Sequence, residues 1–299
     1  MNVTYLIPAR DKRSKIELPL KSAFAQTYPC RIIISDQGST DGTWPFIVDY
    51  VRQQNTRHEV WLMQCPHTPP RGMSAFNIHI NWLMDKIREG IVLISSADDV
   101  AHPEKTSEVV RCFEEHDPAM VLTAQQFQDP DGDCSITAFQ EPEQMLTGKK
   151  VLDHLIGGSS TLAWSAEFFH KVGGAHGIVG IDCFLPFLAA QDKGCYWTPK
   201  VLHSYINHAD AGNMGLGGVL RAAVLANDVK RQKQIAELIQ YQMCTMSVQL
   251  AGKAQELYPD MSMEDRSTMY SEVMSRAYGW TNARNVLTDE GIEPLRMTP

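Results

Sequence analysis

Long apolar stretches are missing from this sequence of 299 residues. No segment approaches the roughly twenty consecutive apolar residues that a membrane-spanning helix needs. Low-complexity tracts and clusters of Lys and Arg are missing as well, and the net charge is −8. A chain with that charge repels a phosphate backbone on average, which disfavours nucleic acid as the main partner but leaves it open. With 43% hydrophobic and 21% charged residues, the composition is that of an ordinary globular protein.

Paired cysteines are missing too. The seven cysteines have neither the spacing of a zinc site nor an even disulfide framework. We therefore expect reduced, mostly buried thiols and a cytoplasmic protein. The first residues, Met1 to Tyr5, lead directly into an apolar segment, so we also expect no signal peptide.

Apolar segments that end in polar turns are prominent in the N-terminal third. Val3–Ile7 and Arg31–Ser35 each predict a short buried strand, with helical spacing over residues 18–26 between them. Directly after the second strand, Asp36 to Thr43 reads Asp-Gln-Gly-Ser-Thr-Asp-Gly-Thr. Such an end presents hydrogen-bond acceptors at the carboxyl edge of a sheet, where open α/β folds bind ligands. A tight turn accounts for the same residue types, and both interpretations stay open at this point.

A further apolar strand, Gly90–Ile94, is followed by two adjacent acids, Asp98 and Asp99. Neighbouring carboxylates at the tip of a buried strand repel each other, so a cation is the natural way to keep both ionised. The alternative is a helix N-cap, because Pro103 is typical of the first turn of a helix that we expect over residues 104–115. The remaining regular elements predicted in this half are strands over residues 60–64 and 121–124, and a helix that ends near Arg88.

Asp182 stands alone at the start of a predicted helix that is otherwise apolar. A carboxylate in such surroundings is costly unless it caps the helix, is paired, or is catalytic. Burial raises the pKa of a carboxyl group, which suits a general base. The residues alone leave an N-cap and a catalytic base equally open.

Three motifs near the N-terminus resemble those of the family 2 glycosyltransferases. Ile7-Pro8-Ala9-Arg10 is similar to the family's first strand end, residues 22–29 to its Ser-x-x-x-Gln-Thr-Tyr-Pro helix, and residues 36–43 to its acidic turn, with Gln37 where an acid is commoner. The resemblance implies a GT-A fold, a Rossmann-like mixed α/β sheet flanked by helices. It covers residues 3–213, so we expect a catalytic domain at 1–213. Helical spacing over 214–299 predicts a helical C-terminal extension for the acceptor side or for oligomer formation.

Later motifs of the same family are matched with departures. In the segment before the Arg88 helix, Phe76 replaces the usual Arg, and Arg71 is a substitute for it. In the acidic motif after the 90–94 strand, Ser96 stands where the first Asp usually lies. Before Asp182, Ile181 replaces the family's Glu. His208 lines up with the histidine that ends the catalytic domain, and His203 is a spare.

The resemblance implies an inverting transfer of sugar from a nucleoside-diphosphate sugar to an acceptor hydroxyl. Asp98 and His208 would hold Mn²⁺ or Mg²⁺, Asp182 would be the catalytic base, and Asp36 would bind the nucleobase. The other nucleotide-binding residues that it implies are Pro8, Arg10, Ser39, Asp41, Arg71, Asn77, Ser96 and Ala97. A UDP-sugar is our first guess for the donor, and the acceptor is left open.

Two alternatives compete with this function. A sugar-phosphate nucleotidyltransferase places a nucleotide over a related sheet, but the segment Pro8 to Arg13 lacks the glycines of its signature. A binding module that holds a sugar nucleotide or a glycan without turnover is favoured by the departures at Phe76, Ser96 and Ile181.

Overall fold

The computed structural model describes seven segments and scattered positions between 229 and 263. The segments are residues 1–69, 73–128, 134–137, 141–148, 150–154, 158–176 and 181–206. The chain divides into two compact units, the first made of residues 1–70, 74–176 and 180–207, and the second of residues 71–73, 177–179 and 208–299. The predicted domain boundary after residue 213 stays a prediction. Among the described residues, no helix combines the length and the apolar content that a bilayer crossing requires.

A ten-stranded mixed sheet forms the centre of the first unit, in the order β3-β2-β1-β4-β9-β6-β10-β5, with β7 on β6 and β8 on β10. Strands β1 to β4 run parallel, and β9 is antiparallel to both of its neighbours. The mixed α/β sheet that we predicted is therefore confirmed. The strands are β1 (Val3–Ala9), β2 (Arg31–Asp36), β3 (Glu59–Gln64), β4 (Ile91–Ile94), β5 (Val100–Ala101), β6 (Met120–Gln128), β7 (Cys134–Thr137), β8 (Gln144–Leu146), β9 (Leu162–Ser165) and β10 (Cys195–Ile206).

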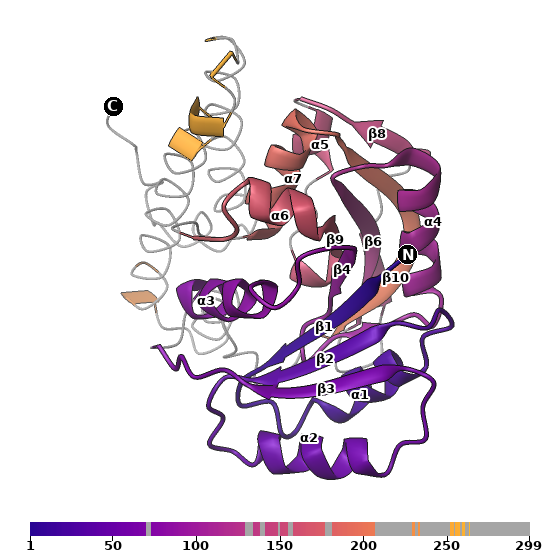
Figure 1. Cartoon of the computed structure of the whole chain (residues 1–299), viewed down its shortest axis with the longest axis vertical. Helices are drawn as coiled ribbons and strands as arrows, with labels where there is room; N and C mark the ends of the chain where they lie inside the picture. The colour runs from indigo at the N-terminus through magenta and orange to yellow at the C-terminus, as the bar shows by residue number, and fades with distance from the viewer. Residues whose placement is uncertain are drawn as a thin grey trace. The chain divides into compact units, whose positions relative to one another are not determined.

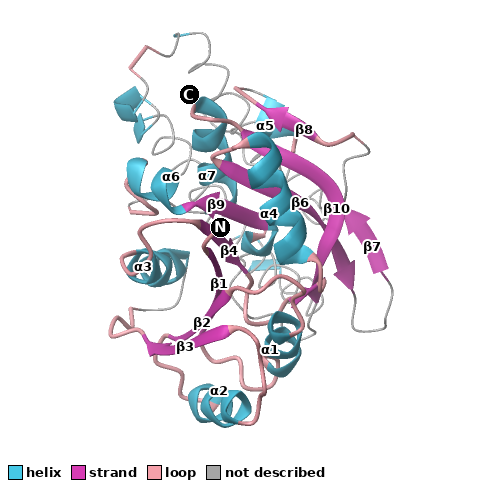
Figure 2. Ribbon diagram, turned by 45° about the vertical axis from the view of Figure 1, so that its right-hand side comes forward, coloured by secondary structure: helices cyan, strands magenta, loops and turns pink. Residues whose placement is uncertain are grey.

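Helices cover both faces of this sheet. Figures 1 and 2 show α1 and α4 on one side, and α3 and α6 on the other. On the α1 side, alternate residues of β1 pack with Leu20 of α1 and Val109 of α4, because successive side chains of a strand point to opposite faces. The helices are α1 (Glu17–Phe24), α2 (Thr43–Arg52), α3 (Met73–Met84), α4 (Lys105–His116), α5 (Lys150–Asp153), the 3₁₀ turn η1 (Ser159–Thr161), α6 (Ala166–Lys171) and α7 (Ile181–Gln191).

Every residue of β1 is buried, as expected of a parallel strand covered on both faces. Pro8 lies in this central strand although proline cannot donate a ladder hydrogen bond. Strand β4 ends at Ile94, opposite Leu6, so Pro8 lies beyond the part of β1 that pairs on that side. Proline is tolerated here because β1 no longer pairs with β4 at this position, close to the carboxyl edge of the sheet.

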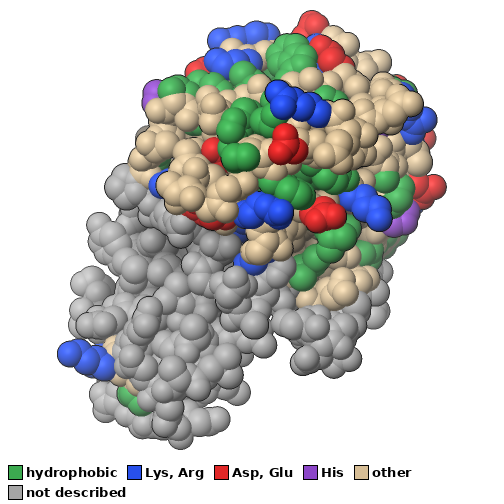
Figure 3. Space-filling model, turned by 90° about the horizontal axis from the view of Figure 1, so that it is seen from below, with side chains coloured by type: hydrophobic (Ala, Val, Ile, Leu, Met, Phe, Trp, Pro, Cys, Tyr) green, Lys and Arg blue, Asp and Glu red, His purple; other side chains and the backbone are tan. Residues whose placement is uncertain are grey.

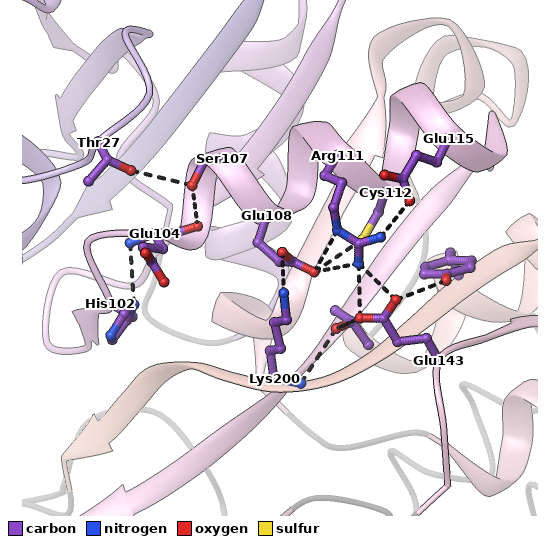
Figure 4. A network of polar contacts seen from close by, with 12 residues as sticks. Thr27, His102, Glu104, Ser107, Glu108, Arg111, Cys112, Glu115, Glu143 and Lys200 are labelled. Carbon is purple, nitrogen blue, oxygen red and sulfur yellow. Dashed lines mark hydrogen bonds and ion pairs between the residues drawn. The ribbon is translucent and has the colours of Figure 1, made fainter.

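A cluster of charged side chains joins α4 to β10 and to the segment before β8. We call it the Arg111 cluster, and Figure 4 shows its contacts. Arg111 donates to Glu108 at 2.6 Å and to Glu143 at 2.8 Å. Lys200 of β10 donates to the other oxygen of Glu108 at 2.6 Å. These contacts tie together elements that are far apart in the sequence.

Charges elsewhere on the first unit are interspersed. On the face that Figure 3 shows, the described Lys and Arg side chains lie among Asp and Glu side chains, without a large patch of one sign.

The four cysteines that the structure describes as free, Cys30, Cys65, Cys112 and Cys195, are all buried. Burial raises the pKa of the thiols of Cys30 and Cys112 to about 12, so these two are unreactive near neutral pH.

Candidate active site

The carboxyl ends of three adjacent parallel strands meet at one edge of the sheet. Strand β1 lies between β2 and β4, with Ala9 opposite Asp36 and Leu6 opposite Ile94 (Figure 1). The loops that follow these strands carry most of the side chains singled out in the sequence. The edge is the place where open α/β sheets bind ligands.

Asp36 is the last residue of β2 and is 1% exposed. Its carboxylate accepts hydrogen bonds from the backbone N–H of Ser39 at 3.0 Å and from the Ser39 hydroxyl. Gly38 has a φ of +67°, and a Cβ there would lie 2.2 Å from Cγ2 of Thr68. Glycine is therefore required for this turn. Gln37 is buried and donates its amide to the carbonyl of Ala75 at 2.9 Å, so it ties the turn to α3.

The acidic turn also fixes the loop that follows β1. Three consecutive backbone N–H groups of that loop donate to side chains of the turn 36–43: Asp11 to Ser39 at 2.8 Å, Lys12 to Thr43 at 2.7 Å, and Arg13 to Asp41 at 2.9 Å. The hydroxyls and carboxylates of this turn therefore stabilise the loop after β1. The role of Ser39 and Asp41 in nucleotide binding stays a prediction.

Asp41 lies just before α2. Its carboxylate accepts from the backbone N–H of Thr43 at 3.0 Å and from the Thr43 hydroxyl at 2.5 Å. Partial burial acts to raise the pKa of Asp41, but the hydrogen bonds from Thr43 and from the Arg13 backbone outweigh it and lower the pKa. The carboxylate thus stays ionised and satisfies backbone donors at the start of the helix.

Asp98 is partly exposed in the loop after β4, and its Oδ2 atom pairs with the ammonium of Lys12. Ala97 beside it is buried. Ser96 donates its backbone N–H to the hydroxyl of Ser160 in η1 at 2.8 Å. The helix α4 begins at Lys105, so neither acid of the Asp98-Asp99 pair caps it, and the N-cap interpretation of this motif is wrong.

Asp99 points into the protein and accepts a hydrogen bond from the Ser160 hydroxyl at 2.5 Å. Lys105 is also buried and donates to the carbonyls of Ile94 at 3.1 Å and Ser160 at 2.7 Å. Burial, together with the charge of Asp98, raises the pKa of Asp99, and burial lowers the pKa of Lys105. This buried pair joins the loop that carries Asp98 to η1.

Asp182 lies in the first turn of α7. Its carboxylate accepts the backbone N–H of Gly158, which precedes η1, at 2.8 Å. Gly158 has a φ of +123°, and a Cβ there would lie 3.1 Å from Oε1 of Gln125. The same amide oxygen lies 3.0 Å from Nε2 of His203. Burial, with Lys105 nearby, lowers the pKa of His203, so this histidine is neutral and lies behind the Gly158 loop.

The remaining predicted residues have these positions. Arg10 donates to the carbonyl of Pro69 at 2.7 Å, and Pro8 pairs with Ser35 across the sheet. Asn77 is buried in α3. Arg71 and His208 lie outside the described residues. Nothing tests their contacts with a nucleotide, and these roles stay predictions.

The three acids Asp36, Asp98 and Asp182, which we call the acidic edge, are connected by a continuous series of contacts. The path runs from Asp36 through Ser39 to the loop after β1, and from Lys12 of that loop to Asp98. It then follows the backbone from Asp98 to Ser96, and passes through Ser160 and η1 to Gly158 and Asp182. Lys12, Gly158 and Ser160 were not among the predicted site residues.

Metal ligands are sparse at this edge. Within the described residues, no three His, Cys, Asp or Glu side chains come together as a metal site. The Asp98 carboxylate offers the oxygen ligand that hard cations prefer, and Mg²⁺ is commonly held by only one or two carboxylates together with substrate phosphates and water. The donor set thus fits a divalent cation that arrives with a phosphorylated substrate, and does not fit an all-protein metal cage.

The fold is a mixed α/β sheet, and contacts connect the three acids of the acidic edge to the loops at the carboxyl ends of its strands. The family model described as glycosyl transferase family 2 matches residues 4–157, and the chain belongs to that family. It is a glycosyltransferase, as the sequence motifs implied. This assignment decides against the nucleotidyltransferase alternative.

Solved structures share the fold. The Staphylococcus aureus TarS fragment 1–349, solved in complex with UDP-GlcNAc, aligns with a TM-score of 0.56 and 14% identity, covering 95% of this chain and 82% of that one. The mannosyltransferase PcManGT from Pyrobaculum calidifontis, solved with GDP-Man and Mn²⁺, aligns with a TM-score of 0.54 and 14% identity, covering 95% and 84%. At these identities the likeness shows the fold alone. No curated protein sequence matches the chain.

Proposed function

We propose that this glycosyltransferase is an inverting, metal-assisted enzyme that uses a nucleoside-diphosphate sugar, with a UDP-sugar as the first choice. The observation that carries the proposal is the acidic edge, because Asp36, Asp98 and Asp182, to which we assign base binding, metal binding and catalysis, lie along one connected path. The sugar nucleotides bound in the two structural neighbours, and the Mn²⁺ bound in the mannosyltransferase, support it at the level of the fold.

Asp182 is the proposed catalytic base. It takes the proton of the acceptor hydroxyl while that oxygen forms a bond to the anomeric carbon. The bond from that carbon to the diphosphate breaks on the opposite side, and the diphosphate leaves with its bonding electrons, so the configuration is inverted. The hydrogen bond from the backbone N–H of Gly158 holds one carboxylate oxygen of Asp182 at 2.8 Å.

Asp98 is the proposed protein ligand of Mn²⁺ or Mg²⁺, with His208 as a second ligand. A bound divalent cation would neutralise charge on the departing diphosphate. Ser96 in place of the family's first acid leaves the loop with one carboxylate fewer, so we expect weak metal binding in the absence of a donor. Asp36 and the loop after β1 would hold the nucleoside.

One observation favours a binding module without turnover as the second candidate. The Lys12 ammonium already neutralises Asp98, as it would in a protein that had lost the metal. The two candidates differ in product formation, because both bind a sugar nucleotide but only the enzyme releases a nucleoside diphosphate.

The experiment measures release of UDP or GDP from a panel of sugar nucleotides, with Mn²⁺, with Mg²⁺ and with a chelator. We expect metal-dependent release by the wild type and its loss in Asp98→Asn. Asp192→Asn is the matched control, because Asp192 is paired with Lys171 far from the acidic edge in the fold. Donor binding without release under any condition would favour the binding module. Release that is unaffected by Asp98→Asn would contradict the metal assignment.

A cytoplasmic location, a helical extension at 214–299 and a homo-oligomer also remain proposals. The buried free thiols among the described cysteines support the first of these. The acceptor stays open.

A further inference from the structure

The contact between Lys12 and Asp98 is unusual for this chain. The two side chains are only 12% and 22% exposed, whereas those of the surface pair Lys193 and Asp117 are 55% and 80% exposed. Lys12 comes from the loop after β1, and Asp98 from the loop after β4. The pair therefore bridges the two loops at the centre of the acidic edge, in a place where water screens charges less than at the surface.

The backbone of Lys12 is fixed on both sides. Its N–H donates to the Thr43 hydroxyl at 2.7 Å, and its carbonyl accepts from the N–H groups of Lys15 and Ile16 at 2.9 Å each. The preceding residue, Asp11, has a φ of +50° and accepts the backbone N–H of Thr40 at 2.8 Å. The structure thus holds the origin of the Lys12 side chain beside Asp98.

A divalent cation and the Lys12 ammonium compete for the same carboxylate. A metal ligand must approach to about 2.0–2.1 Å for Mg²⁺, and an ammonium already in contact with that oxygen would be strongly repelled by a doubly charged ion. A metal ion at the oxygen of Asp98 that Lys12 contacts therefore requires Lys12 to move away. Its fixed backbone keeps the released ammonium at the acidic edge.

We propose that Lys12 is a displaceable counter-ion, which neutralises Asp98 when no metal is bound and moves to the diphosphate of the donor when a divalent cation takes its place. The proposal rests on the proposed function, which puts the metal and the diphosphate at Asp98. An ammonium suits the second position because it is a compact charge with three rotatable donors.

Cooperative binding of metal and donor follows from this exchange. Metal alone must break the ion pair and leaves the ammonium without an anion, so it binds weakly. Metal together with a diphosphate gives the ammonium a new partner. By linkage, each ligand then raises the affinity for the other by the same factor. Removing the ammonium should strengthen the binding of metal alone and weaken the binding of the diphosphate.

The test measures binding and does not need turnover. Electron paramagnetic resonance follows free Mn²⁺ during titration of the wild type, Lys12→Met, Lys12→Arg and Asp98→Asn. Calorimetry then measures UDP and GDP binding in excess Mn²⁺. Lys171→Met is the control, because it removes another lysine–aspartate pair outside the site. Melting curves show that each variant is folded.

We expect Lys12→Met to bind Mn²⁺ about tenfold more tightly than the wild type and to bind the nucleoside diphosphate about tenfold more weakly, a coupling of ordinary size. Lys12→Arg keeps the charge and should stay near the wild type in both measurements. Equal Mn²⁺ affinity in Lys12→Met and the wild type would contradict the role of Lys12 as a counter-ion of Asp98. Unchanged nucleotide affinity in Lys12→Met would contradict the movement of Lys12 to the diphosphate. Failure of the proposed function looks different, because Asp98→Asn would then bind Mn²⁺ and nucleotide as well as the wild type does.

Discussion

Arg111 donates hydrogen bonds to three glutamates (Figure 4), whereas Asp98 is paired with a single lysine, Lys12. Among the described residues, Asp182 accepts one hydrogen bond, from a backbone N–H. An ionised carboxylate can accept about four. The acids of the edge thus keep capacity for a ligand, while those of the Arg111 cluster have used much of theirs. The fully partnered charges of the Arg111 cluster thus join parts of the fold, and we propose that the sparsely partnered acids of the edge serve binding and chemistry.

Replacing the proposed base should have the largest effect. We expect Asp182→Asn to lower kcat by about 10² to 10⁴-fold, the usual contribution of general base catalysis, with little change in donor Kd or Tm. The amide oxygen can still accept the Gly158 N–H, so the fold is preserved. Steady-state kinetics and donor titration test this. Normal transfer by the variant would remove Asp182 from the mechanism.

Replacing Arg111 should give the opposite pattern. Arg111→Leu leaves Glu108 and Glu143 without their shared partner, and we expect a loss of about 2 kcal/mol in the free energy of unfolding, reduced from the fully buried case by partial exposure. Urea denaturation measures it. Arg52→Leu, which breaks an exposed pair with Asp49, is the control and should change stability by less than about 0.5 kcal/mol. If Arg111→Leu kept its stability and lost its activity, the assignment of the Arg111 cluster to the fold would be contradicted.

A substitution at Gly38 tests whether the turn 36–43 serves both the stability of the fold and donor binding. Gly38→Ala forces a side chain into a positive φ and against Thr68, so we expect a loss of about 1–2 kcal/mol in stability. Because Gly38 lies between Asp36 and Ser39, donor binding should weaken as well. The same two measurements on Gly42→Ala, where φ is also positive but a Cβ meets no atom within 4 Å, separate strain from collision. Unchanged donor affinity in Gly38→Ala would contradict a role of this turn in nucleotide binding.

Acid should weaken the Arg111 cluster by a smaller amount. Burial acts to raise the pKa of Glu108, but the hydrogen bonds from Arg111 and Lys200 outweigh it, so the pKa is lowered. A lowered carboxyl pKa contributes stability above the unfolded value of about 4.3 and loses it as the pH falls through the folded value. The stability advantage of the wild type over Glu108→Gln should therefore shrink between pH 7 and pH 3.5 in urea denaturation. Glu104→Gln on an exposed position is the control, and an advantage that grows in acid would contradict the assignment.

Much of the first unit could be predicted from the sequence. Strands β1, β2 and β4 begin at or next to the predicted residues, because each is an apolar run closed by a polar turn. Strand β10 was missed although it is the longest. Pro199 and Lys200 interrupt its pattern, and the register shifts between Thr198 and Val201 accommodate them.

Candidate site residues could be predicted only where the residue type and its position after an apolar strand are recognisable in the sequence. Acids after buried strands are visible in the sequence, and Asp36 and Asp98 were singled out in this way. The partner of Asp98 is 86 positions away, and a lysine in a loop looks like any solvated charge. Gly158 likewise acts through a backbone N–H, which every non-proline residue has. Such contacts are set by the topology of the sheet and leave no mark on local sequence.

An anomalous difference map from crystals soaked with Mn²⁺ and UDP tests the central claim most directly. The account predicts one Mn²⁺ peak within coordination distance, about 2.2 Å, of the Asp98 carboxylate, with the diphosphate against it and the uracil near Asp36. A peak away from Asp98, or a nucleotide bound on another face of the sheet, would contradict it.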